Sequence, residues 1–156
     1  MAGKALSVAR LHALETNVQV NYVEGTAEEI ARAQPAHFRT VTCLEMLEHV
    51  ADYASTVQAC ADMAKPGADI FFSTINRNPK AYALLVIGAE YIMNILPKGT
   101  HEYSKFIKPS ELCTAIRAAG LEVQDISGMV YNPFTRQCRV NRDVDANYLV
   151  HARKPA

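Results

Sequence analysis

The apolar and polar residues of the chain follow two alternating periods, one helical and one extended. Helical spacing predicts helices over residues 5–16, 26–33, 53–65, 81–96 and 110–119. Alternating runs, or runs rich in β-branched and aromatic residues, predict strands over residues 18–23, 38–44, 69–75, 121–130 and 146–153. Strands and helices that follow one another in this way favour an α/β fold with a largely parallel sheet. Such sheets bind ligands at the carboxyl ends of their strands.

Capping and turn residues support several of these boundaries. Thr26 with Glu29 forms a capping-box pattern, and Pro35 ends the helix that follows it. Lys65-Pro66-Gly67 predicts a stop after the next helix, and Gly120 ends the last one. The elements are therefore short and closely connected, as expected of a single domain.

Composition excludes some classes of function. The 156 residues are 49% hydrophobic, which is too high for a disordered chain. Sixteen Lys and Arg balance sixteen Asp and Glu, so the broad positive field of a sequence-independent nucleic-acid binder is not expected. The four cysteines, at positions 43, 60, 113 and 138, form no CxxC pair. We interpret them as free thiols in a reducing compartment.

The first candidate for chemistry is the run CLEMLEHV, residues 43–50, which follows a predicted strand. Glu45, Glu48 and His49 would share one face if the chain turned into a helix there. Two carboxylates and an imidazole can hold a hard divalent cation. They can equally form a carboxylate–histidine pair for general base catalysis, or simply a solvated polar turn.

Two further segments carry candidate binding residues. Residues 73–79, STINRNP, run from a predicted buried strand into a group of polar residues. Of these, Asn76 and Arg77 could bind an anion or a phenol-type oxygen through their N–H groups. The alternative is an ordinary polar loop before Pro79 with no binding role. Residues 81–96 are almost entirely apolar but too short to cross a bilayer. Basic residues flank this stretch, which indicates a helix that lies in the membrane surface or lines a site for an apolar substrate; the alternative is plain core burial. These residues are Arg77, Lys80, Lys98, Lys105 and Lys108.

Four segments together resemble a known family. CLEMLEHV, KPGADIFFSTINRN, VIGAEYIMNILPKGTHEYSKFIKPSEL and VDANYLVHARK are similar to the ubiquinone-biosynthesis O-methyltransferases, which are class I S-adenosylmethionine-dependent methyltransferases. The resemblance implies a Rossmann-like α/β sheet of seven strands in the order 3-2-1-4-5-7-6, with helices on both faces and the last strand antiparallel. It covers strands 3 to 7 only. No GxGxG loop occurs, and the first two strands of the family fold are lacking.

The resemblance also assigns site residues. Leu44 would contact S-adenosylmethionine, and Glu45, Glu48 and His49 would be catalytic and bind Mg²⁺. Substrate or membrane contacts fall on Asn76, Ile87, Tyr91, Ile92, Ile95, Lys98 and His101. Residues 1–156 would form a partial methyltransferase domain, in which residues 80–108 are a membrane- and substrate-facing insertion.

The function implied is O-methylation of a polyprenylated catechol or hydroquinone in ubiquinone biosynthesis. Expected partners are that phenol, an anionic membrane surface and other ubiquinone-biosynthesis proteins, with no nucleic acid. The expected location is the cytoplasmic face of the bacterial inner membrane, or the mitochondrial inner membrane in a eukaryote.

Without the first two strands, residues 18–23 and the fourth family strand would lack pairing partners. We therefore expect impaired cofactor binding and a tendency to aggregate. The alternatives are a non-catalytic remnant, a lipid-surface module, or a methyltransferase for another small phenol.

Overall fold

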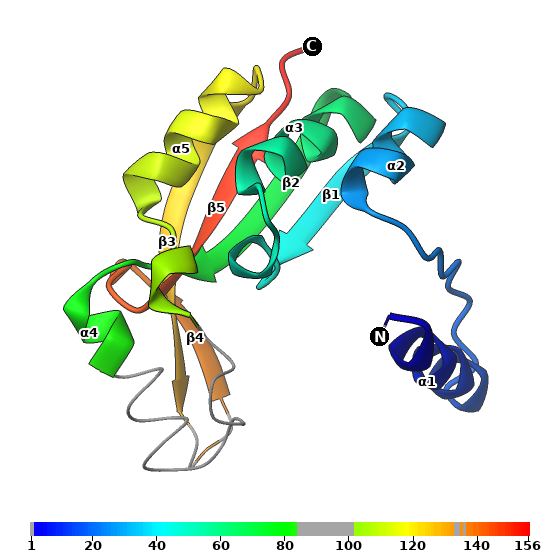
Figure 1. The fold of residues 1–156 in the computed structure, drawn as a ribbon, viewed down its shortest axis with the longest axis horizontal. Coiled ribbons are helices and arrows are strands. Elements are labelled where there is room, and N and C mark those ends of the chain that lie inside the picture. Colours follow the sequence, from blue (N-terminus) through cyan, green and yellow to red (C-terminus); the bar gives the residue numbers. More distant parts are fainter. Residues whose placement is uncertain (1, 84–101, 133–134, 136) are drawn as a thin grey trace.

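A five-stranded sheet with helices along one face forms the body of the protein (Figure 1). The structure is a computed structural model that describes residues 2–83, 102–132, 135 and 137–156. The strands lie in the order β1-β2-β5-β3-β4. Their bounds are β1 Phe38–Leu44, β2 Ala64–Ile75, β3 Glu122–Asn132, β4 Gln137–Asn141 and β5 Asn147–Arg153.

Strand directions agree with the class I methyltransferase arrangement. β1 runs parallel to β2, whereas β5 runs antiparallel to both β2 and β3. The order β1-β2-β5-β3 thus reproduces the expected 4-5-7-6 half of the family sheet, with its antiparallel last strand. β4 adds a hairpin to β3. Sequence reasoning missed β4, which is only five residues long and exposed along its whole length, so no burial pattern marks it.

Four of the five described α-helices begin and end close to their predicted positions; the fifth, α4, was not predicted. Their bounds are α1 Ala2–Glu15, α2 Ala27–Ala33, α3 Tyr53–Met63, α4 Pro79–Ala81 and α5 Pro109–Ala118, and two 3-10 turns are η1 Leu47–His49 and η3 Tyr103–Lys105. The capping box forms: the Glu29 N–H donates to Thr26 Oγ1 at 3.2 Å, and the Thr26 N–H donates to the Glu29 carboxylate at 2.8 Å. Asp52 caps the start of α3, because its carboxylate accepts the N–H groups of Ala54 and Ser55.

The main hydrophobic core lies between the sheet and helices α2, α3 and α5. Ile70 and Phe72 of β2 and Tyr148 and Val150 of β5 are completely buried there. Leu47 of η1 belongs to the same cluster, so the turn after β1 is anchored on the helix-covered side. This anchoring fixes the side of the sheet on which the residues after Leu47 lie.

The prediction of a strand over residues 18–23 is wrong. These residues are extended but pair with no strand, and Val18, Val20 and Val23 are each at least half exposed. A strand forms only with a neighbour for its backbone N–H and C=O groups. Within the described residues, α1 is set apart from the sheet at the end of this extended segment (Figure 1), and β1 is an edge strand. The expected open edge is therefore found, whereas aggregation stays a prediction.

β2 begins earlier than predicted. It starts at Ala64 and includes Lys65-Pro66-Gly67, which were predicted to separate α3 from the strand. The register between β2 and β1 shifts at this point, between Phe38 and Thr40 of β1. Gly67 has a φ of +76°, which glycine adopts without strain, and its N–H donates to the Lys154 carbonyl at 2.9 Å. The Lys154 Nζ donates to the carbonyls of Ala61 and Ala64, at 2.7 and 2.9 Å. The chain end thereby caps the carboxyl terminus of α3.

The predicted helix over residues 81–96 falls almost wholly outside the described residues. Only α4, Pro79–Ala81, and the following turn are described. Among the described residues, no helix is both long and apolar enough to span a membrane.

Candidate active site at the carboxyl ends of β1 and β2

The turn that follows β1 is fixed by hydrogen bonds to β2. Leu44, the last residue of β1, pairs with Ser73 in the parallel register. The next residue, Glu45, has a φ of +49°, which is uncommon for a residue with a side chain. Its N–H donates to both the carbonyl and the Oγ of Ser73, at 3.1 and 2.9 Å. Ser73 therefore holds the backbone where the candidate motif begins.

Two successive hydroxyl groups of β2 hold the two acids of the motif. Ser73 Oγ donates to Glu45 Oε1 at 2.6 Å, and Thr74 Oγ1 donates to Glu48 Oε2 at 2.8 Å. Successive side chains of a strand point to opposite faces of the sheet. Thr74 and Glu48 lie on the side of the buried core, whereas Glu45 is exposed. The two carboxylates are thus attached to opposite faces of β2.

His49 stands beside the buried acid. Its Nε2 lies 4.0 Å from Glu48 Oε1, and its side chain is 49% exposed while that of Glu48 is 3% exposed. This separation is too long for a hydrogen bond. The site therefore places a solvent-facing histidine beside a buried acid.

The structure corrects the assumed helix across the motif. Glu45 lies in a turn, and only Leu47–His49 form a 3-10 turn, so Glu45 does not share a helix face with Glu48 and His49. No group of three His, Cys, Asp or Glu side chains that could hold a metal ion occurs among the described residues. The arrangement does not fit the predicted Mg²⁺ site, because each carboxylate is directed to a different hydroxyl on a different face of the sheet.

The other predicted binding residues are placed as follows. Leu44 is 50% exposed at the end of β1, next to Glu45. Asn76 is buried, and its Nδ2 donates to the Val144 carbonyl at 2.9 Å, so part of its amide ties down the loop before β5. Ile87, Tyr91, Ile92, Ile95, Lys98 and His101 lie outside the described residues. Their roles stay predictions.

Three of the basic residues that flank the apolar stretch are engaged in ion pairs. Arg77 binds Glu111 and donates to the Phe106 carbonyl. Lys80 Nζ lies 3.2 and 2.9 Å from Asp143 and Asp145. Lys105 pairs with Glu102 at 3.4 Å. These contacts neutralise much of the positive charge that was predicted to attract an anionic membrane.

Buried titratable groups surround the carboxyl end of β2. Burial raises the pKa of the Tyr148 phenol, and Cys113 and Glu111 add to the effect; its hydroxyl donates to the Ile107 carbonyl at 2.9 Å. A hydrogen bond from the Cys60 thiol lowers the pKa of Cys43, while the pKa of Cys60 is raised. All four cysteines are free thiols, as predicted. Tyr148 and Cys60 therefore stay protonated at neutral pH.

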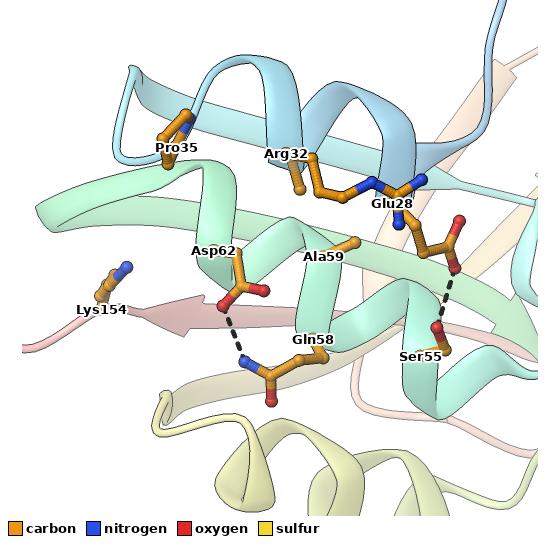
Figure 2. Close-up of a pocket in the computed structure, with 9 residues that line it drawn as sticks. Glu28, Arg32, Pro35, Ser55, Gln58, Ala59, Asp62 and Lys154 are labelled. Carbon is orange, nitrogen blue, oxygen red and sulfur yellow. Dashed lines mark hydrogen bonds between the residues drawn. The ribbon is translucent and has the colours of Figure 1, made fainter.

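A separate hollow of about 530 Å³ lies between α2, α3 and the end of the chain (Figure 2). Four of its polar side chains form two hydrogen-bonded pairs: Ser55 Oγ donates to Glu28 Oε1 at 3.0 Å, and Gln58 Nε2 donates to Asp62 Oδ1 at 2.8 Å. It contains none of the predicted site residues. The hollow is thus distinct from the acid–imidazole motif.

Sequence reasoning gave Ser73 and Thr74 no role in the site. They were part of a segment singled out for Asn76 and Arg77 instead. The available signal was the position of two successive hydroxyl residues at the end of a buried strand. In a parallel sheet that end lies beside the end of its neighbour, β1.

Comparisons with known proteins identify the family. The methyltransferase domain family matches residues 5–126. A SAM-dependent methyltransferase structure from Thermotoga maritima has a TM-score of 0.60 and 14% identity, over 86% of this chain and 64% of that one. This likeness concerns the fold alone. The chain belongs to the methyltransferase domain family.

Closer relatives share one description. The ubiquinone biosynthesis O-methyltransferases of Saccharophagus degradans strain 2-40 and Azoarcus sp. strain BH72 are both 58% identical, over 155 and 154 residues. Each alignment covers 99% of this chain and 66% of the relative. The chain thus spans slightly less than two thirds of the length of these relatives.

Proposed function

We propose that the protein catalyses S-adenosylmethionine-dependent O-methylation of a polyprenylated catechol or hydroquinone in ubiquinone biosynthesis. The observation that carries the proposal is the 58% identity to two ubiquinone biosynthesis O-methyltransferases along nearly the whole chain. The acid–imidazole motif at the carboxyl ends of β1 and β2 supports it, because α/β sheets bind their ligands at this edge.

The cofactor supplies an electrophilic methyl group on a sulfonium when it is bound. Leu44 offers a half-exposed apolar side chain at the end of β1, which suits an apolar part of that cofactor. In this proposal Leu44 contacts the cofactor and the motif that follows it faces the phenol. The phenol oxygen must lose its proton to become a good nucleophile.

His49 is the proposed general base. A ring nitrogen of its exposed imidazole takes the phenol proton, and the resulting imidazolium presents Nε2 to Glu48 Oε1. The buried carboxylate of Glu48 accepts the Thr74 hydroxyl hydrogen through Oε2, which leaves Oε1 beside the imidazolium. The charge on the imidazolium is thereby compensated without a second proton transfer.

Magnesium bound by Glu45, Glu48 and His49 is the alternative assignment for activating the phenol. It would require Glu45 to leave Ser73 and cross to the other side of β2. Chelation separates the two assignments. Activity that disappears with a chelator and returns with Mg²⁺ would replace the base assignment with the metal assignment.

The function is tested directly by methyl transfer from radiolabelled S-adenosylmethionine in the full-length protein. We expect a polyprenylated catechol to be methylated and a catechol without a tail to react at least tenfold more slowly. Equal rates would favour a methyltransferase for another small phenol. Failure to bind S-adenosylmethionine by calorimetry would favour the non-catalytic lipid-surface module.

We further propose peripheral attachment to an anionic membrane through residues 80–108, at the bacterial inner membrane or its mitochondrial counterpart, near other ubiquinone-biosynthesis proteins. The support is the apolar stretch 81–96, since a polyprenyl substrate is confined to the bilayer. Because Arg77, Lys80 and Lys105 are paired, apolar insertion must supply most of the affinity.

Replacing Ile87, Ile92 and Ile95 together by Ser is expected to reduce sedimentation with anionic phospholipid vesicles about tenfold or more. Full burial of one isoleucine contributes about 1.5–3 kcal/mol, so even partial insertion of three gives this effect. The matched control replaces Val8, Leu11 and Leu14 of α1, which are also exposed and apolar. Unchanged sedimentation of the first variant, or an equal loss in the control, would contradict the proposal.

A further inference from the structure

Ser73 and Thr74 share an arrangement that the fold alone does not require. Each is a hydroxyl residue at the carboxyl end of β2, and each donates to one acid of the motif after β1. Both are buried, with Thr74 completely inaccessible. A residue that only filled space at these positions would be apolar, as Ile70 and Phe72 are on the same strand.

We propose that Ser73 and Thr74 are positioning residues of the methyl-transfer site, Ser73 for Glu45 and Thr74 for Glu48. This inference rests on the proposed function. Neither hydroxyl touches the phenol. Their role is to hold two carboxylates, and through Glu48 the imidazole of His49, in the arrangement that accepts the proton.

Thr74 carries the larger part of this role. Glu48 is 3% exposed, so its carboxylate has little water to solvate it and needs protein donors. The Thr74 hydroxyl supplies one at 2.8 Å to Oε2, which leaves Oε1 directed toward His49. Without that hydroxyl, the Glu48 side chain can rotate away from His49, and the imidazolium of His49 then loses the carboxylate beside it.

Ser73 acts on the backbone as well as on the side chain. Its Oγ accepts the Glu45 N–H at 2.9 Å and donates to Glu45 Oε1 at 2.6 Å, and its carbonyl accepts the same N–H. These contacts close around a residue at a φ of +49°, a conformation that surrounding structure must maintain. Ser73 therefore sets the path of the chain toward Glu48 and His49.

The test compares Thr74→Val with Thr74→Ser in the full-length protein. Valine keeps the shape of threonine without the hydroxyl, and serine keeps the hydroxyl. We expect Thr74→Val to lower kcat about 10- to 100-fold with KM changed less than threefold, because a hydrogen bond to a charged group is lost. Thr74→Ser is expected to keep kcat within threefold of the unmodified protein.

Thr56→Val is the matched control. Thr56 is also buried, and its Oγ1 donates at 3.3 Å to the carboxylate of Glu28, an acid of α2 that is not part of the motif. We expect it to alter stability but not kcat. Equal kcat values for Thr74→Val and Thr74→Ser, or an equal loss in Thr56→Val, would overturn the proposal.

A readout that does not use activity separates this inference from the proposed function. Ring ¹⁵N spectra of His49 are expected to change in Thr74→Val and to be retained in Thr74→Ser and Thr56→Val. The amide signal of Glu45 is expected to move in Ser73→Ala. If these spectral changes occur but no phenol is methylated, the positioning contacts stand and the proposed reaction falls. If the spectra of Thr74→Val and Thr74→Ser are the same, the positioning role falls.

Discussion

Replacing His49 by Ala is expected to lower kcat for methyl transfer by about 10²–10⁴-fold, the usual contribution of a positioned general base. The imidazole is half exposed at the carboxyl edge of the sheet, and the buried carboxylate of Glu48 lies 4.0 Å from its Nε2. Removing it leaves the phenol proton without an acceptor. Initial rates with saturating cofactor and polyprenylated catechol measure the effect.

Two variants serve as controls for this result. His12→Ala removes an exposed histidine of α1, a helix set apart from the sheet, and is expected to leave kcat unchanged. Glu48→Gln keeps the size of the buried side chain but removes its charge, and is expected to give an intermediate loss of about 10- to 100-fold. Retention of most of the activity in His49→Ala would refute the base assignment.

Replacing Phe72 by Ala is expected to reduce the free energy of unfolding by about 3–5 kcal/mol. Phe72 is completely buried in β2, which lies between β1 and β5, and it belongs to the core that joins the sheet to α3 and α5. Its removal leaves a cavity among side chains that are fixed on all sides. Urea unfolding followed by circular dichroism gives the change in midpoint and slope.

The neighbouring Phe71 provides the matched control, since it differs from Phe72 in the face of the sheet to which it points. Phe71 is only partly buried and stacks on His151, with 4.7 Å between ring centroids. Phe71→Ala is expected to cost less than half as much as Phe72→Ala. Equal losses would mean that both faces of the sheet are packed alike, contrary to the described fold.

Local sequence signals predicted most elements of the sheet and its helices. β1 was predicted to the residue from its β-branched and aromatic content, and α2 from its capping box. These elements agree with local propensity because packing and capping act in the same direction. Residues 18–23 show the limit: their alternation is that of a strand, but strand formation depends on a partner that local pattern does not reveal.

The candidate site was predicted in composition but not in geometry. The motif residues lie at the predicted edge, with Glu48 next to His49. The grouping of Glu45 with them depended on an α-helix immediately after β1, and the positive φ of Glu45 prevents that helix. Ser73 lies 28 residues away in sequence, and its three hydrogen bonds with Glu45 depend on strand pairing. Only the sheet register reveals such a contact.

The pairing of Leu44 with Ser73 makes strand alignment part of the chemistry of the protein. A shift of β2 by one residue would exchange the faces to which Ser73 and Thr74 point. Neither acid would then keep its present donor, although no residue of the motif had been changed. Substitutions remote from the motif, such as those in the irregular pairing near Gly67, can therefore weaken the site by disturbing the alignment of the two strands.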